Sequence, residues 1–157
     1  MGKTLSRGDK APDFDLFDDR NKVRSLKSYA GQKLVLYFYP KDDTTGCTKE
    51  SIEFSALKPD FDKIGTAILG VSPDTPASHA RFKEKHKLAL DLVSDPAKST
   101  LEAYGVWTEK SLYGRKYLGV ERTTFLIGPD GKIAEVWNKV KVPGHAEAVF
   151  LAARDHA

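Results

Sequence analysis

Short apolar runs alternate with amphipathic segments along the first half of the chain. Residues 34–39 form a continuous apolar and aromatic run, and residues 67–71 form a second one. Runs of this length without polar positions are typical of strands that are buried on both faces of a sheet. Apolar residues recur at helical spacing over residues 47–64 and again over about 77–86. The order strand, helix, strand, helix predicts parallel strands joined by crossover helices.

Several residues predict where these elements begin and end. Pro40 ends the first strand, and Thr44 or Thr45 is suited to cap the helix that follows. Pro59 is expected to kink this helix rather than end it, because apolar positions continue beyond it. The inward stripe of the helix is expected to comprise Ile52, Ala56, Leu57, Phe61 and Ile64.

The second half of the chain has a different pattern. A short helix is expected near residues 101–104, with Gly105 closing it. Two apolar segments on either side of the turn 128–131 predict an antiparallel hairpin over residues 124–137. A last helix is expected over about residues 144–154, with Val149, Leu151 and Ala152 facing inward. Residues 14–17 can add a small N-terminal hairpin. Taken over the whole chain, the periodicity of apolar positions predicts a mixed α/β fold.

Composition narrows the class of protein. With 157 residues, 40% of them hydrophobic and 30% charged, the chain is expected to form one domain over residues 1–157. The net charge of +3 is small, and the mixed signs of residues 81–87 favour a solvated helix face over a nucleic-acid site. No apolar run has the length of a membrane span, so we expect a cytoplasmic protein with neither a membrane nor a nucleic acid as partner.

Cys47 is the only cysteine in the sequence, and its neighbours are polar. A core cysteine is the alternative interpretation, but core thiols have apolar neighbours. In the first turn of a helix, a thiol lies beside unpaired backbone N–H groups and the positive end of the helix dipole, which favour the thiolate. The sequence therefore predicts a reactive thiol. A single cysteine also excludes a disulfide within these residues and a multi-cysteine metal site.

The spacing Pro40-x-x-x-Thr44-x-x-Cys47 resembles the active-site signature of the peroxiredoxins, and in particular the subgroup called peroxiredoxin Q or bacterioferritin comigratory protein. The resemblance implies a thioredoxin-like fold with a central mixed sheet flanked by helices and an N-terminal hairpin extension. It also implies a peroxidase that reduces hydrogen peroxide and organic hydroperoxides through a cysteine sulfenic acid, without a cofactor. Segments that agree in order with this subgroup are 2–17, 37–50, 69–74, 92–95, 105–107 and 122–127.

The same resemblance assigns roles to side chains around the thiol. Cys47 is the expected nucleophile, the Thr44 hydroxyl is expected to bond the thiol or the peroxide, and Pro40 is expected to shield the pocket from water. Arg122 is expected at the start of a strand against the thiolate, where a permanently charged guanidinium stabilises negative sulfur. Without the resemblance, a surface arginine would be the preferred interpretation of this residue.

Two further residues are expected to support the site. Glu50 matches a family position that orients the arginine, although an ordinary acid favoured by the helix dipole is an alternative. Gly46 directly precedes the cysteine. No metal site is expected, since His79 and His86 are roughly two helical turns apart. These two histidines, together with His145 and His156, are expected to be solvated.

The chain departs from the subgroup in lacking a second cysteine. Many relatives carry one at the position of Ile52, and others near Phe82 and Lys83. The sequence therefore predicts a one-cysteine enzyme whose sulfenic acid is reduced by an external thiol, such as a thioredoxin-type protein, glutathione or a small dithiol. A monomer or weak homodimer is expected. The alternative function is a peroxide-sensing switch or thiol-regulated binding protein. Thr45, where the subgroup usually has proline, predicts a slightly looser loop.

Overall fold

The computed structural model describes residues 5–156, so residues 1–4 and 157 of the expected domain lie outside the description. The strands are β1 (Asp15–Asp18), β2 (Val23–Ser25), β3 (Lys33–Phe38), β4 (Thr66–Ser72), β5 (Asp91–Ser94), β6 (Trp107–Leu112), β7 (Arg115–Val120), β8 (Thr123–Ile127) and β9 (Ile133–Trp137). The helices are α1 (Thr45–Lys63), α2 (Pro76–His86), α3 (Ser99–Ala103) and α4 (His145–Asp155), with a 3-10 helix, η1 (Leu26–Tyr29). Within the described residues, no helix combines the length and apolarity needed to cross a membrane.

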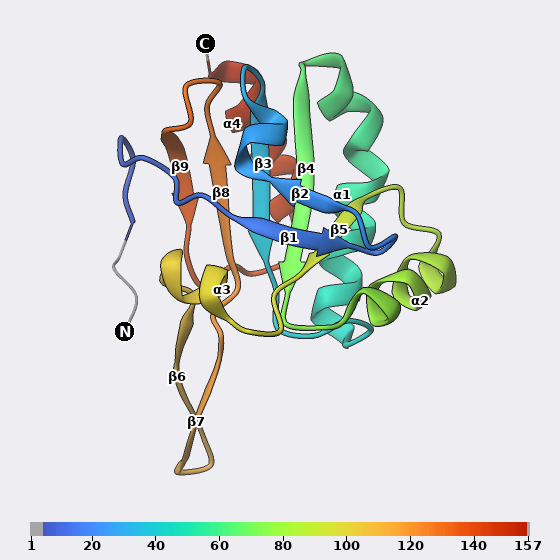
Figure 1. Cartoon of the computed structure of the whole chain (residues 1–157), viewed down its shortest axis with the longest axis vertical. Coiled ribbons are helices and arrows are strands. Elements are labelled where there is room, and N and C mark those ends of the chain that lie inside the picture. The colour runs from blue at the N-terminus through green and yellow to red at the C-terminus, as the bar shows by residue number, and fades with distance from the viewer. Residues whose placement is uncertain (1–4, 157) are drawn as a thin grey trace.

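A seven-stranded mixed sheet has the order β2-β1-β5-β4-β3-β8-β9 (Figure 1). Strand β3 pairs in parallel with β4, and β4 pairs in parallel with β5, with α1 and α2 as the connecting helices. Strands β8 and β9 form the antiparallel hairpin expected from the sequence. The N-terminal hairpin of β1 and β2 joins the sheet through antiparallel pairing of β1 with β5. The mixed α/β prediction is confirmed.

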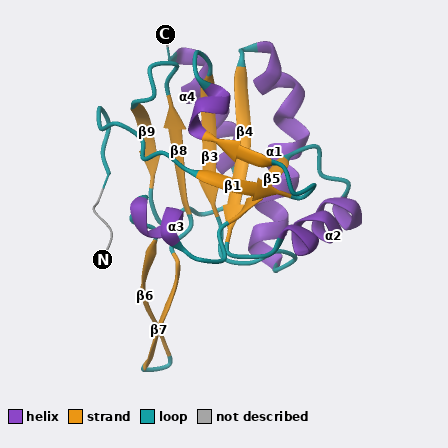
Figure 2. Cartoon of the chain, viewed as in Figure 1, coloured by secondary structure: helices purple, strands orange, loops and turns teal. Residues whose placement is uncertain are grey.

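Strand β3 lies in the interior of this sheet, and both of its faces are covered. Leu34, Leu36 and Phe38 belong to one hydrophobic cluster, which includes residues of η1 and α3. Val35 and Tyr37 belong to a second cluster, which includes residues of α1, α2 and α4. Figure 2 shows the sheet between these two sets of helices. Burial on both faces explains why the sequence of β3 is apolar throughout rather than alternating.

Helix α1 begins as expected, but it presents a different face to the core. Thr44 is its N-cap residue, and the helix continues through Pro59 to Lys63. However, Ile52 is 44% exposed and Ala56 is also exposed, so the predicted stripe is wrong at these positions. Polar residues occupy part of the inward face because they bond to partners inside the fold. The buried residues of α1 are Cys47, Glu50, Ser51, Phe54 and Phe61.

The remaining helical predictions are largely confirmed. Gly105 follows α3 with a φ of 72°, a left-handed conformation that glycine adopts without steric cost. Helix α4 covers the predicted segment and buries Val149. Leu151 is 40% exposed, which corrects its predicted inward orientation. The reason is that α4 buries a narrow stripe containing Ala146, Val149 and Ala153.

Strands β6 and β7 form a separate hairpin that was not expected from the sequence. It projects away from the body of the molecule (Figure 1), and its turn contains Tyr113 and Gly114, both with positive φ. Most of its side chains are exposed or half-buried, so the sequence lacks the apolar runs that indicate a core strand. The hairpin matters for the site because β7 leads directly to Arg122.

Candidate active site

Cys47 is the third residue of α1 and follows the loop that leaves β3. The first backbone bond of the helix runs from the Thr48 amide to the Thr44 carbonyl oxygen over 2.8 Å. The amides before Thr48 therefore have no partner within the helix, and they lie at its positive end. Cys47 itself is only 1% exposed. The thiol is thus shielded from bulk water and lies at the positive end of the helix dipole.

Arg122 lies in the short link between β7 and β8, and its guanidinium joins two residues of α1. Its Nη2 donates a hydrogen bond to Cys47 Sγ over 3.3 Å, and its Nη1 donates to Glu50 Oε1 over 2.7 Å. Cys47 is 75 residues away from Arg122 along the chain. The structure therefore brings together three of the residues that the sequence predicted for one site.

Gly46 lies against the same guanidinium. A Cβ atom at this position would stand 3.1 Å from Arg122 Nη2, closer than ordinary van der Waals contact. The glycine thus gives the arginine room to reach the sulfur. From the sequence, Gly46 was known only to precede the cysteine, and its steric role was not predicted.

Thr44 and Pro40 border the site on its loop side. The Thr44 hydroxyl donates to the Lys41 carbonyl oxygen over 2.8 Å, and Thr44 is exposed. Pro40 is half-buried. Among the described residues, the hydrogen-bond partner of Cys47 Sγ is Arg122 rather than Thr44. The predicted contact between the Thr44 hydroxyl and the thiol or peroxide therefore stays a prediction, which requires the hydroxyl to turn from the Lys41 carbonyl.

Glu50 is a buried carboxyl group with a raised pKa. It is 1% exposed, and its Oε2 atom has no hydrogen-bond partner among the described residues. Burial raises the pKa of Glu50 to about 7, although the charge and hydrogen bond of Arg122 act to lower it. The carboxyl group therefore changes charge near neutral pH, directly beside the arginine that contacts the thiol.

His145 is a neighbour of Glu50 that sequence reasoning missed. Its Nε2 lies 4.0 Å from Glu50 Oε2 and 2.8 Å from Thr124 Oγ1. The expectation that His145 is solvated is wrong, because the start of α4 packs its ring among Phe54 and Trp137. Burial, with the charge of Arg122, lowers the pKa of His145 to about 4, so the ring is neutral at pH 7. No local pattern in the sequence signals this burial, which depends on where α4 meets α1.

Replacing Glu50 by glutamine is expected to change how stability depends on pH. Because the pKa of Glu50 rises from 4.5 to about 7 on folding, the folded protein holds a proton that the unfolded chain releases between these values. The stabilisation is therefore complete below about pH 4.5 and is lost as the pH rises to about 7. The loss corresponds to about 3 kcal/mol. Glutamine does not ionise, so the variant should gain this amount relative to the wild type over that range.

The measurement is the free energy of unfolding by urea for both proteins at several pH values. His145 contributes with the opposite sign, since its lowered pKa makes stability rise with pH between about 4 and 6.5. Taking the difference between wild type and Glu50→Gln at each pH cancels this contribution. A difference that does not vary with pH would mean that Glu50 ionises at its ordinary pH in the folded protein.

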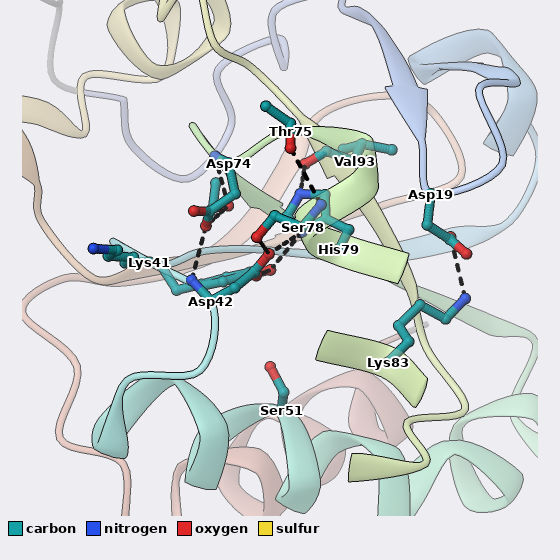
Figure 3. Close-up of polar contacts among 12 residues, drawn as sticks. Asp19, Lys41, Asp42, Ser51, Asp74, Thr75, Ser78, His79, Lys83 and Val93 are labelled. Atoms are coloured by element: carbon teal, nitrogen blue, oxygen red, sulfur yellow. Dashed lines mark hydrogen bonds and ion pairs between the residues drawn. The ribbon is translucent and has the colours of Figure 1, made fainter. Parts of the chain in front are cut away.

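A second cluster of polar side chains includes Asp42, which lies in the loop that precedes α1. Ligand atoms of Asp42, Asp74 and His79 lie within 4.8 Å of one another, a grouping of the type that binds metal ions (Figure 3). These atoms are engaged in hydrogen bonds with one another and with neighbouring residues. His79 is fully buried, so the expectation of a solvated histidine is wrong here too. It lies on the inward face of α2, where its ring bonds to Asp42 and to β5.

Comparison with known proteins identifies the family. The AhpC/TSA family matches the sequence over residues 7–136. The chain belongs to the AhpC/TSA family. Peroxiredoxin Bcp of Xanthomonas campestris is 50% identical to it over 133 residues, which cover 85% of this chain and 83% of that protein. Peroxiredoxin Bcp of Bacillus subtilis is 41% identical over 152 residues, which cover 97% of each chain.

Solved structures of AhpC/TSA relatives have the same fold. A structure of Xanthomonas campestris peroxiredoxin Q superimposes with a TM-score of 0.87 at 47% identity, covering 91% of this chain and 90% of that one. A Xylella fastidiosa PrxQ variant superimposes with a TM-score of 0.90 at 42% identity, covering 96% of each. The thioredoxin-like fold is therefore confirmed. This member of the AhpC/TSA family is a thiol-dependent peroxidase, and Cys47 is the only cysteine in its sequence.

Proposed function

We propose that Cys47 is the nucleophile that attacks the peroxide, with Arg122, Thr44 and Pro40 around the reacting atoms. The observation that supports this most directly is the 3.3 Å contact between Arg122 Nη2 and Cys47 Sγ at the start of α1. A guanidinium in this position stabilises the thiolate before reaction and the charge that develops on the peroxide oxygen during it. Glu50 holds the guanidinium through a hydrogen bond, and Gly46 leaves room for it.

The chemistry takes place in two stages. The Cys47 thiolate attacks one oxygen of a hydroperoxide, so that an S–O bond forms while the O–O bond breaks. The departing oxygen takes up a proton and leaves as water or an alcohol, and the cysteine becomes a sulfenic acid. An external thiol then attacks the sulfenic sulfur and expels water, and a second thiol releases Cys47 from the mixed disulfide. The cysteine is oxidised by two electrons, and two thiols return them.

The reductant is proposed to come from outside the chain. With no second cysteine in the sequence, the sulfenic acid has no partner for a disulfide within these residues. A thioredoxin-type protein, glutathione and a small dithiol all supply the required chemistry. We further propose that the protein acts in the cytoplasm as a monomer or weak homodimer and reduces both hydrogen peroxide and organic hydroperoxides. A relative in Xanthomonas campestris has been studied for its alkyl peroxide reduction activity, which supports the second substrate class.

The alternative is a peroxide sensor in which Cys47 oxidation is a signal rather than a step in a cycle. The buried thiol beside a cation suits both functions, because both require rapid oxidation. Turnover distinguishes them. Repeated peroxide consumption with an added thiol supports the enzyme, whereas consumption of a single equivalent supports the sensor.

Oxidation without a reductant is expected to stop at a sulfenic acid that can be trapped. One equivalent of hydrogen peroxide should leave Cys47 reactive toward dimedone, and mass spectrometry should find the adduct on the peptide that contains this residue. Because no thiol in the chain competes, excess peroxide should convert Cys47 to sulfinic and sulfonic acids and inactivate the protein. The control is the same treatment with dithiothreitol present, which should prevent the loss of activity.

The contrary result is a covalent dimer. A disulfide between the Cys47 residues of two chains would appear on non-reducing gels, and if it formed and was reduced during turnover, the one-cysteine mechanism would be wrong. The burial of Cys47 argues against this outcome, since two sulfurs with 1% exposure cannot meet without opening both pockets.

A further inference from the structure

The loop that connects β3 to α1 is held by side chains that do not belong to the contact between Arg122 and Cys47. Asp42 lies in this loop, between Pro40 and Thr44, and it is only 7% exposed. Its carboxylate accepts hydrogen bonds from three groups (Figure 3). The donors are the Tyr39 hydroxyl at 2.7 Å, the Ser78 hydroxyl at 2.8 Å and His79 Nδ1 at 2.8 Å. The last two belong to α2, so this side chain fastens the loop to that helix.

The backbone of the loop is fastened as well. The Asp42 amide donates to Asp74 Oδ2 over 2.8 Å, and the same oxygen accepts from the Ser72 hydroxyl at 2.6 Å. A metal ion bound by Asp42, Asp74 and His79 would have to displace these hydrogen bonds. The cluster is therefore better explained as a structural anchor than as a metal site.

His79 completes the anchor, and its ring is bonded at both nitrogens. Nδ1 contacts the Asp42 carboxylate, and Nε2 lies 2.9 Å from the Val93 carbonyl oxygen of β5. Burial raises the pKa of the Tyr39 hydroxyl well above its usual value, so this group remains a neutral donor to Asp42. The two ring nitrogens both have a partner outside α2, one in the loop and one in β5. The geometry thus describes a buried His79–Asp42 hydrogen bond that links the loop, α2 and β5.

We propose that His79 and Asp42 form a positioning pair, which holds the loop from Pro40 to Thr44 against α2 and so fixes one wall of the peroxide pocket. Neither residue is hydrogen-bonded to Cys47, so the pair acts through the loop. The inference rests on the proposed role of Cys47 as nucleophile. Removal of one member leaves buried polar atoms of the other without a hydrogen-bond partner, which loosens the loop by favouring its exposure to water. Small displacements of groups that orient a substrate slow the reaction strongly.

Two substitutions of His79 separate positioning from packing. The amide nitrogen of asparagine is the same number of bonds from Cβ as Nδ1 of histidine is. His79→Asn can therefore still donate a hydrogen bond to Asp42, but it loses the hydrogen bond to the Val93 carbonyl oxygen. The amide nitrogen of glutamine corresponds in the same way to Nε2. His79→Gln can therefore still donate a hydrogen bond to the Val93 carbonyl oxygen, but it loses the hydrogen bond to Asp42. We expect the rate of Cys47 sulfenic acid formation to fall about tenfold or more in His79→Gln. In His79→Asn it should remain within about threefold of the wild type.

Asp43 provides a matched control on the same loop. It accepts from Lys85 Nζ at 2.6 Å and from His86 Nε2 at 2.7 Å, and it also ties the loop to α2, but at the surface. Exposed ion pairs contribute little, so Asp43→Asn should leave the rate of sulfenic acid formation unchanged. The rate is followed by stopped-flow fluorescence after mixing with hydrogen peroxide, below the unfolding temperature of each variant, with dimedone labelling to confirm the product.

The outcomes separate the two proposals. If wild-type Cys47 forms no sulfenic acid, the proposed function fails and the positioning pair loses its basis. If the wild type reacts but His79→Asn and His79→Gln lose rate equally, the contact with Asp42 is not what matters, and the positioning role is overturned. Equal rates in all three proteins would also overturn it.

Discussion

Replacement of Cys47 by serine is expected to abolish peroxide turnover while leaving the fold intact. Serine has nearly the shape of cysteine, so the buried space beside Tyr37 and Phe54 is filled almost as before. Its hydroxyl, however, is not ionised at neutral pH and is a weak nucleophile without an adjacent base. Peroxide consumption in the presence of dithiothreitol should fall to the uncatalysed rate. The thermal unfolding midpoint, measured by circular dichroism, should stay close to that of the wild type.

A residual rate in Cys47→Ser that depends on both thiol and protein concentration would contradict the mechanism, because the sequence contains no other thiol. The serine variant is also the reference for trapping experiments. It should give no dimedone adduct at any peroxide concentration, which confirms that labelling of the wild type reports on Cys47.

Replacement of Arg122 by alanine is expected to slow sulfenic acid formation by about a hundredfold to a thousandfold. This is the effect of removing one preorganised donor from a developing negative charge. The thiolate population at neutral pH should also fall, because the nearby positive charge that favours the ionised thiol is removed. The ultraviolet absorbance of the thiolate measures this change. Arg122→Lys should recover only part of the rate, because an ammonium cannot donate to Cys47 and Glu50 in the fixed geometry of a guanidinium.

Arg115→Ala is the matched control for Arg122. It removes the same side chain from the start of β7, where the arginine is exposed on the projecting hairpin. Its rate should equal that of the wild type. If the two alanine variants lost rate equally, general electrostatic attraction would explain the effect. If Arg122→Ala reacted at the wild-type rate, the contact with Cys47 Sγ would have no catalytic role.

Strand β3 and the hairpin of β8 and β9 could be predicted from the sequence because their apolar runs and turn residues are local signals. Helix α1 shows where such signals fail. Its inward face at the site consists of Cys47, Glu50 and Ser51, so the hydrophobic pattern pointed to Ile52 instead. Polar groups are buried there because partners from distant elements satisfy them, and those partners are not visible in the local sequence.

The contact between Arg122 and Cys47 had to be inferred from the family resemblance, since nothing in composition or spacing relates two residues so far apart in the chain. The burial of His79 and His145 could not be inferred even in this way. Each ring is enclosed by packing between elements, α2 against β5 in the first case and α4 against α1 in the second. Tertiary packing therefore decided the environment of both histidines.

The position of β3 between β4 and β8 has a consequence for synthesis of the chain. Its last residue, Phe38, pairs with Val71 on one side but with Thr123 on the other. While the polypeptide emerges from the ribosome, α1 and its Cys47 are therefore available long before the strand that places Arg122. Pairing between segments so distant in sequence is completed late. The nascent chain thus carries a thiol without its guanidinium partner until Arg122 and β8 have been translated, and the site is completed only when β8 pairs with β3.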